Sequence, residues 1–196
     1  MNYKILRIGF MITAIALASA AIGNLLMTNY ISSLKQTPED IKINKVEPEV
    51  FKAPCDTCVY IDKLGITNEQ NNPILRVSIY TNGELLKSYR ALSGRADTQN
   101  LDRNVANNES PSPNGEYIIQ PETKGYIAET GGVFLPYEPL FETQRTSLGF
   151  HTDPSWGQDN GEDGTSGCVA VKDIKEYKDL VKTIENNNIT RLIINY

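Results

Sequence analysis

ILRVSIYTNGELLKSYRAL, residues 74–92, is the stretch that decides the fold. Its first part, 74–80, alternates apolar and polar side chains, which is typical of a strand with one buried face. Asn82 and Gly83 then provide a two-residue turn, because both residue types tolerate the positive φ angles of a tight hairpin. Residues 84–92 form the returning strand, so the stretch predicts an antiparallel hairpin.

Strand-like segments continue on both sides of this hairpin. One precedes it at 58–62, and a polar loop at 93–112 follows it. Further strands are expected at 116–120, 148–150, 169–171 and 191–196, and the segment 133–141 is aromatic and interrupted by prolines.

One helix is expected after these strands. Asp173 is a good N-cap, since its carboxylate can accept the free amides of the first turn. The helix would bury an apolar stripe made of Ile174, Tyr177, Leu180, Val181 and Ile184. One helix among many strands predicts a mainly β domain.

The N-terminal residues read as an export segment followed by a tether. Lys4 and Arg7 precede the apolar run 8–27, and Ala18-Ser19-Ala20 resembles a signal-peptidase site. Residues 1–28 are therefore either a cleaved signal peptide or a membrane anchor. Residues 29–54 are a polar linker, and 55–196 form the domain. We expect an exported protein of the periplasm or cell envelope, in contact with a membrane only through an uncleaved 1–28 segment.

Charge and cysteine usage exclude several classes of function. A formal net charge of -5 without a basic run argues against nucleic-acid binding. Cys55 and Cys58 form either a short local disulfide, two thiols or a thioredoxin-like redox pair. A zinc site needs about four ligands, and only His151 and Cys168 remain to complete one, so we expect no metal. The acidic run 159–164 reads as a solvated turn rather than a calcium loop.

Cys168 and the single histidine, His151, are the candidate catalytic residues. A cysteine nucleophile reacts as the thiolate, and a neighbouring imidazole is a common base for it. Gly167 allows a tight turn before the cysteine, whose amides could face an oxyanion. The hydroxyls of Thr165 and Ser166 could shape the same site.

The order of these residues resembles the L,D-transpeptidase catalytic domain family, cysteine enzymes that cross-link bacterial peptidoglycan. That family has a histidine, a variable loop and then Ser/Thr-x-Gly-Cys before an apolar residue, which His151 and the segment 165–169 match. An upstream Pro-x-Gly-x-Tyr element is matched at 113–117. The resemblance covers about residues 58–196.

The resemblance implies a β-sandwich-like fold with the site in a cleft at one end. It implies that Cys168 is the nucleophile and His151 the general base and acid, acting without a cofactor. The partners would be peptidoglycan stem peptides: a tetrapeptide stem loses its terminal D-alanine and its acyl group passes to an amine.

The chain departs from the family pattern after the cysteine. Ala170 stands where many members have arginine or asparagine, and Lys172 could substitute for that residue. We take Tyr137, Trp156 and Lys172 as candidate substrate-binding residues. The alternatives are an L,D-carboxypeptidase or amide hydrolase on the same fold, a non-catalytic module that binds the cell wall, and a redox protein.

Overall fold

The described part of the chain is an eight-stranded sheet with one α-helix. The structure is a computed structural model that describes residues 53–121 and 132–196. The strands are β1 (Cys58–Thr67), β2 (Pro73–Thr81), β3 (Glu84–Ser93), β4 (Gly115–Ile119), β5 (Leu135–Pro139), β6 (Gly149–Thr152), β7 (Val169–Val171) and β8 (Arg191–Ile194). A 3-10 helix, η2 (Ala96–Thr98), follows β3, and the helix α2 (Ile174–Asn186) follows β7.

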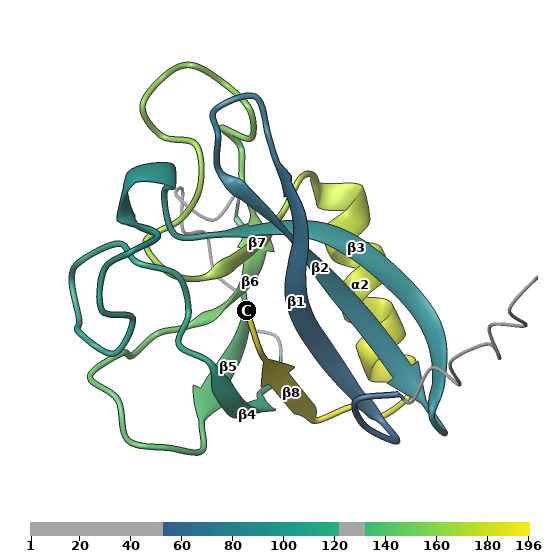
Figure 1. Cartoon of the computed structure of the whole chain (residues 1–196). Coiled ribbons are helices and arrows are strands. Elements are labelled where there is room, and N and C mark those ends of the chain that lie inside the picture. The colour runs from purple at the N-terminus through teal and green to yellow at the C-terminus, as the bar shows by residue number, and fades with distance from the viewer. Residues whose placement is uncertain (1–52, 122–131) are drawn as a thin grey trace, which may run out of the picture. The chain divides into compact units, whose positions relative to one another are not determined.

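The sheet closes into a barrel, in the order β1-β2-β3-β7-β6-β5-β4-β8 (Figure 1). The hairpin β2–β3 has its turn at Asn82 and Gly83, with φ angles of 54° and 76°. The sandwich-like arrangement that we expected is not confirmed, because β1 pairs with β8 in parallel and closes the sheet. Side-chain alternation tells which face of a strand is buried, but it does not tell which distant strand is its partner.

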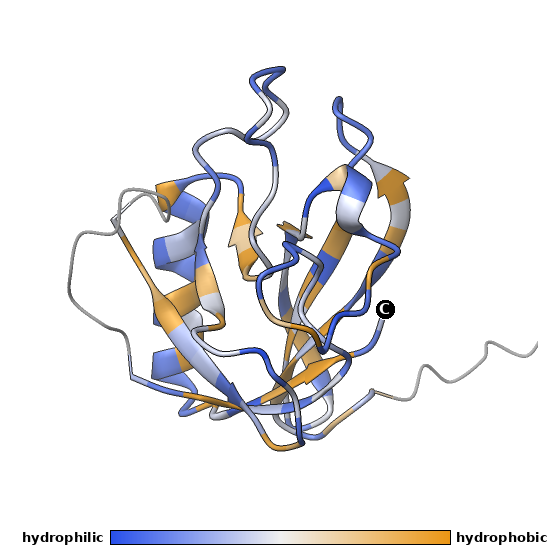
Figure 2. Ribbon diagram, turned by 90° about the vertical axis from the view of Figure 1, so that its left-hand side faces the viewer, coloured by the Kyte–Doolittle hydropathy of each residue, from blue (hydrophilic) through white to orange (hydrophobic). Residues whose placement is uncertain are grey.

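The helix α2 packs onto the same apolar core as the strands. Asp173 caps it, accepting hydrogen bonds of 2.9 Å from the amides of Lys175 and Glu176. Four members of the expected stripe are buried in the core: Tyr177, Leu180, Val181 and Ile184. Ile174 is instead 43% exposed, because the first turn of the helix extends beyond the core. Apolar segments of the strands and helix appear in orange in Figure 2.

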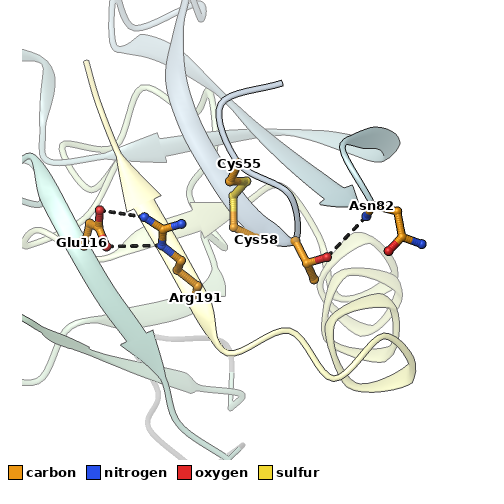
Figure 3. Close-up of a disulfide and its surroundings, with 6 residues drawn as sticks. Cys55, Cys58, Asn82, Glu116 and Arg191 are labelled. Atoms are coloured by element: carbon orange, nitrogen blue, oxygen red, sulfur yellow. Dashed lines mark hydrogen bonds and ion pairs between the residues drawn. A yellow bond between two sulfur atoms is a disulfide. The ribbon is translucent and has the colours of Figure 1, made fainter. Parts of the chain in front are cut away.

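A disulfide joins Cys55 to Cys58 at the start of β1 (Figure 3). The same segment holds the hairpin turn, since the Gly83 amide donates to the Asp56 carbonyl at 2.7 Å and the Asn82 amide donates to Thr57 Oγ1 at 3.3 Å. The disulfide therefore lies where β1 meets the β2–β3 turn. The chain has three cysteines, so Cys168 is left as the free thiol.

The predictions for 1–28 and for nearly all of the linker 29–54 concern residues outside the described ranges. Within those ranges, no helix is both long and apolar enough to cross a membrane.

Three loops surround the start of β7. They span residues 94–114, 140–148 and 153–168; the first two lie to the left in Figure 1 and the third at the top. The strands β6 and β7 pair in parallel, with Phe150 opposite Val169 and His151 opposite Ala170. This pairing positions the two candidate catalytic residues.

Candidate active site

Cys168 and His151 lie on the same face of neighbouring strands. Extending the register of β6 and β7 by one residue places Gly149 opposite Cys168. Side chains two residues apart on a strand share a face, so His151 points to the same side as position 149. Both Cys168 and His151 line one cavity of about 1200 Å³.

Gly149 lies opposite Cys168 and packs tightly against residues 134 and 135. A Cβ atom there would lie 2.5 Å from the Phe134 ring and 2.8 Å from the Leu135 carbonyl oxygen. A backbone hydrogen bond links Gly149 to Cys168. A side chain at position 149 would therefore clash with Phe134 and Leu135.

His151 is held as the tautomer that a general base requires. Its Nδ1 lies 2.6 Å from the Thr152 carbonyl oxygen, which can only accept, so Nδ1 carries the proton. Nε2 is then unprotonated and can accept a proton from a thiol. The side chain is 5% exposed; burial lowers the pKa of His151, and the bond to the Thr152 carbonyl partly opposes this. The imidazole is therefore neutral at neutral pH.

The thiol of Cys168 is also neutral at rest. Burial raises its pKa to about 11, although the backbone of Gly149 and the charge of Arg145 act in the opposite direction. The Sγ atom lies 3.6 Å from the carbonyl oxygen of Ser147, a residue with a left-handed φ of 57°. The resting pair is thus thiol and imidazole rather than thiolate and imidazolium, and the proton must move as the sulfur attacks.

Serine and tyrosine hydroxyls anchor the carbonyl oxygen just before the nucleophile. Ser112 Oγ donates to the Gly167 carbonyl at 2.5 Å, and Ser93 Oγ donates to it at 3.3 Å. The Tyr137 hydroxyl lies 2.6 Å from Ser112 Oγ. Because a peptide plane holds its C=O and N–H on opposite sides, these bonds fix the direction of the Cys168 amide.

Thr165 is the second anchor of this turn. Its hydroxyl accepts from the amides of Gly94 at 3.0 Å and Gly167 at 3.1 Å, and donates to the Cys168 carbonyl at 2.7 Å. The Gly167 amide is therefore occupied, and our expectation that it faces an oxyanion is wrong. The Cys168 amide has no acceptor among the described residues, so it is the donor left for that role.

We expect Thr165→Val to destabilise the fold by about 1–3 kcal/mol, because two buried amides and a carbonyl lose their partner while the side-chain shape is kept. Denaturant unfolding measures this free energy. Thr190→Val is the matched control, since Thr190 is exposed, and it should change the value by less than about 0.5 kcal/mol. Equal values for the two variants would contradict the anchoring role.

The cavity brings together most, but not all, of the residues expected at the site. Cys168, His151, Thr165, Ser166 and Tyr137 line it. Two other candidates, Trp156 and Lys172, line a separate pocket of about 930 Å³. Lys172 is thus not beside Cys168, and the side chain of Ala170 is fully buried.

The acidic run is exposed at 159–162, as expected for a solvated turn, but Asp163 near its end is buried and bonded. Asp163 is buried and accepts from Asn68 Nδ2 at 2.8 and 2.9 Å and from the Gly157 amide at 2.5 Å. Asp153 is buried too, and accepts from the amides of Ser155 at 2.8 Å and Gly164 at 2.9 Å. These carboxylates hold the base of the loop, and turn-forming composition alone did not reveal this.

Two arginines at the site were missed from the sequence. Arg95 lines the cavity and pairs with Glu109 at 3.0 Å and Glu162 at 2.9 Å, so it joins two of the loops. Arg145 lies buried behind the turn of Cys168. Neither arginine is part of a sequence motif that could be recognised, and only the folded chain brings them to Cys168.

A family model of the L,D-transpeptidase catalytic domain (YkuD) matches residues 66–189. No curated protein matches the chain. Among solved structures, the helical cell shape determining protein Pgp2 from Campylobacter jejuni is similar at 14% identity and a TM-score of 0.48, covering 71% of this chain and 47% of that one. Bd1075 from Bdellovibrio bacteriovorus is similar at 17% identity and a TM-score of 0.41, covering 71% and 48%.

The chain thus spans about half the length of these two proteins. The family match covers well over half of the chain and includes both His151 and Cys168. The chain belongs to the L,D-transpeptidase catalytic domain family.

Proposed function

We propose that this protein is a peptidoglycan L,D-transpeptidase that uses Cys168 as nucleophile and His151 as general base and acid. The observation that carries the proposal is one cavity into which the free thiol and a neutral imidazole with an unprotonated Nε2 both open. Membership of the family supports the substrate class, the peptide stems of the bacterial cell wall.

The first half-reaction forms a thioester. Nε2 of His151 takes the thiol proton as Sγ of Cys168 attacks the carbonyl carbon of the L-centre before the terminal D-alanine. The Cys168 amide donates to the oxygen as it becomes negative. The C–N bond then breaks, and the imidazolium gives its proton to the leaving amine of D-alanine.

The second half-reaction releases the enzyme. An amine of a second stem loses a proton to Nε2 and attacks the thioester carbon, which forms the new amide. The C–S bond breaks and the imidazolium returns the proton to the sulfur. With water in place of the amine, the same steps give a carboxypeptidase, so the choice of acceptor decides between the two activities.

The location that we propose is the periplasm or cell envelope. Residues 1–28 have the basic start and apolar run of an export segment, and peptidoglycan stems lie outside the cytoplasm. The mass of the protein isolated from the cell would tell whether this segment is cleaved.

We expect the wild-type protein to gain the mass of one acyl group when it is incubated with a tetrapeptide stem donor or with a carbapenem. The reason is that a thioester forms before the acceptor arrives, and intact-mass spectrometry detects it. Muropeptide analysis after incubation with sacculi then separates new cross-links from trimmed stems. Protein that stays unmodified by both reagents, yet binds sacculi, would be a wall-binding module and not an enzyme.

A further inference from the structure

Arg145 is a buried arginine directly behind the turn that carries the nucleophile. Its side chain is 5% exposed. Nη1 donates to Asn108 Oδ1 at 3.2 Å, to Ser110 Oγ at 2.9 Å and to the Ser110 carbonyl at 3.2 Å, and Nη2 donates to the Ser166 carbonyl at 2.8 Å. All of these acceptors are neutral.

The charge of Arg145 has no carboxylate partner in the described part of the chain. None of the ion pairs within 53–121 and 132–196 includes it. The other cation close to the site, Arg95, is already paired with Glu109 and Glu162. A buried charge without a counter-ion disfavours folding, so stability alone gives no reason for a guanidinium here.

The guanidinium packs against the backbone next to the sulfur. A Cβ atom added at Gly167 would overlap Nη2 of Arg145, and Gly167 has a φ of +115°. The residue at 167 therefore has to be glycine for the arginine to reach the turn. The charge of Arg145 lowers the pKa of the Cys168 thiol, against the effect of burial.

We propose that Arg145 is a positioning residue for acyl transfer at Cys168. Its guanidinium ties the Ser166 carbonyl to residues 108–110 and so fixes the turn that aims the Cys168 amide and sulfur. Its unpaired charge stabilises the negative charge that develops on the sulfur and on the carbonyl oxygen during attack. This inference rests on the proposed function, because it concerns the same nucleophile.

Two variants separate the charge from the hydrogen bonds. Arg145→Lys keeps the charge but loses the paired Nη1 and Nη2 donors that bind residues 108–110 and the Ser166 carbonyl. Arg145→Gln keeps a polar side chain without charge. Arg191→Gln is the matched control, since Arg191 pairs with Glu116 on the exposed side of β8 and β4. Alkylation of Cys168 at about pH 9 is one readout, and it needs no peptide substrate. Acylation by the donor peptide is the other, and it also depends on the proposed function.

We expect Arg145→Gln to slow alkylation at least about threefold and acylation about 10²-fold. Arg145→Lys should alkylate within about twofold of wild type, yet acylate about tenfold more slowly, because the turn is no longer clamped. Arg191→Gln should match wild type in both assays.

If folded Arg145→Gln is alkylated as fast as wild type, the proposed role of the charge is overturned. If Arg145→Lys is acylated as fast as wild type, the proposed role of the hydrogen bonds to the turn is overturned. If Arg145→Gln does not fold, Arg145→Lys decides alone: slowed alkylation in this variant overturns the proposal. A wild type that alkylates but never acylates would refute the proposed function, while the alkylation ratios would still test Arg145.

Discussion

Cys168→Ala is expected to lose acyl-enzyme formation altogether, a reduction of at least about 10⁴-fold in the rate of acylation. The chain has three cysteines, and two of them form the Cys55–Cys58 disulfide. No other thiol can therefore replace the missing nucleophile. The substitution removes one sulfur that bonds to the Ser147 carbonyl at 3.6 Å and to the backbone of Gly149, and no buried charge or side-chain partner is lost with it, so the fold should persist.

Intact-mass spectrometry with the tetrapeptide donor measures this loss, and thermal unfolding checks the fold. The matched control replaces the other two cysteines, as a Cys55→Ser/Cys58→Ser double variant. This control should still be acylated, because the disulfide lies at the start of β1 and lines neither pocket. An acyl group found on Cys168→Ala would place the nucleophile elsewhere.

His151→Gln should slow acylation at neutral pH by about 10²–10⁴-fold. A thiol whose pKa is raised to about 11 is only about 10⁻⁴ ionised at pH 7. The reaction therefore depends on the imidazole to remove the proton during attack. Glutamine keeps much of the side-chain volume but cannot act as a base.

The pH dependence of acylation gives a second test of the same residue. The active imidazole is the neutral form, so the wild-type rate should rise through the pKa of His151, which burial places below its usual 6.5, and stay level through neutral pH. The rate of His151→Gln should lack this rise and increase with pH as the thiol ionises. A variant that keeps the wild-type profile would show that His151 is not the base.

The hairpin and the chemical pair could be predicted from the sequence because each depends on local signals. Alternation around Asn82-Gly83 marks the β2–β3 hairpin, and a single histidine leaves no choice of base for a cysteine. The parallel pairing of β6 with β7 is different. It joins consecutive strands across the loop 153–168, and no local pattern encodes the partner of a short buried strand.

The supporting residues of the site could not be predicted for a related reason. Ser93 ends β3, Ser112 and Arg145 come from two different loops, and the three meet at the turn of Cys168. Conversely, Trp156 and Lys172 are near the motif in sequence but line a different pocket. Closeness along the chain was a poor guide here, because Lys172 follows the end of β7 and Trp156 lies in the loop 153–168, and both line the other pocket.

The stretch between base and nucleophile begins and ends on paired strands, and Asp153 and Asp163 bind backbone amides at its base. The spacing of imidazole and sulfur is thus fixed without the exposed tip at 158–162. A change in the length or the charge of that tip would therefore leave the His151 imidazole and the Cys168 sulfur in register. Under the proposed function, exchanging this one surface segment would change what reaches the thioester and leave the positions of base and nucleophile as they are.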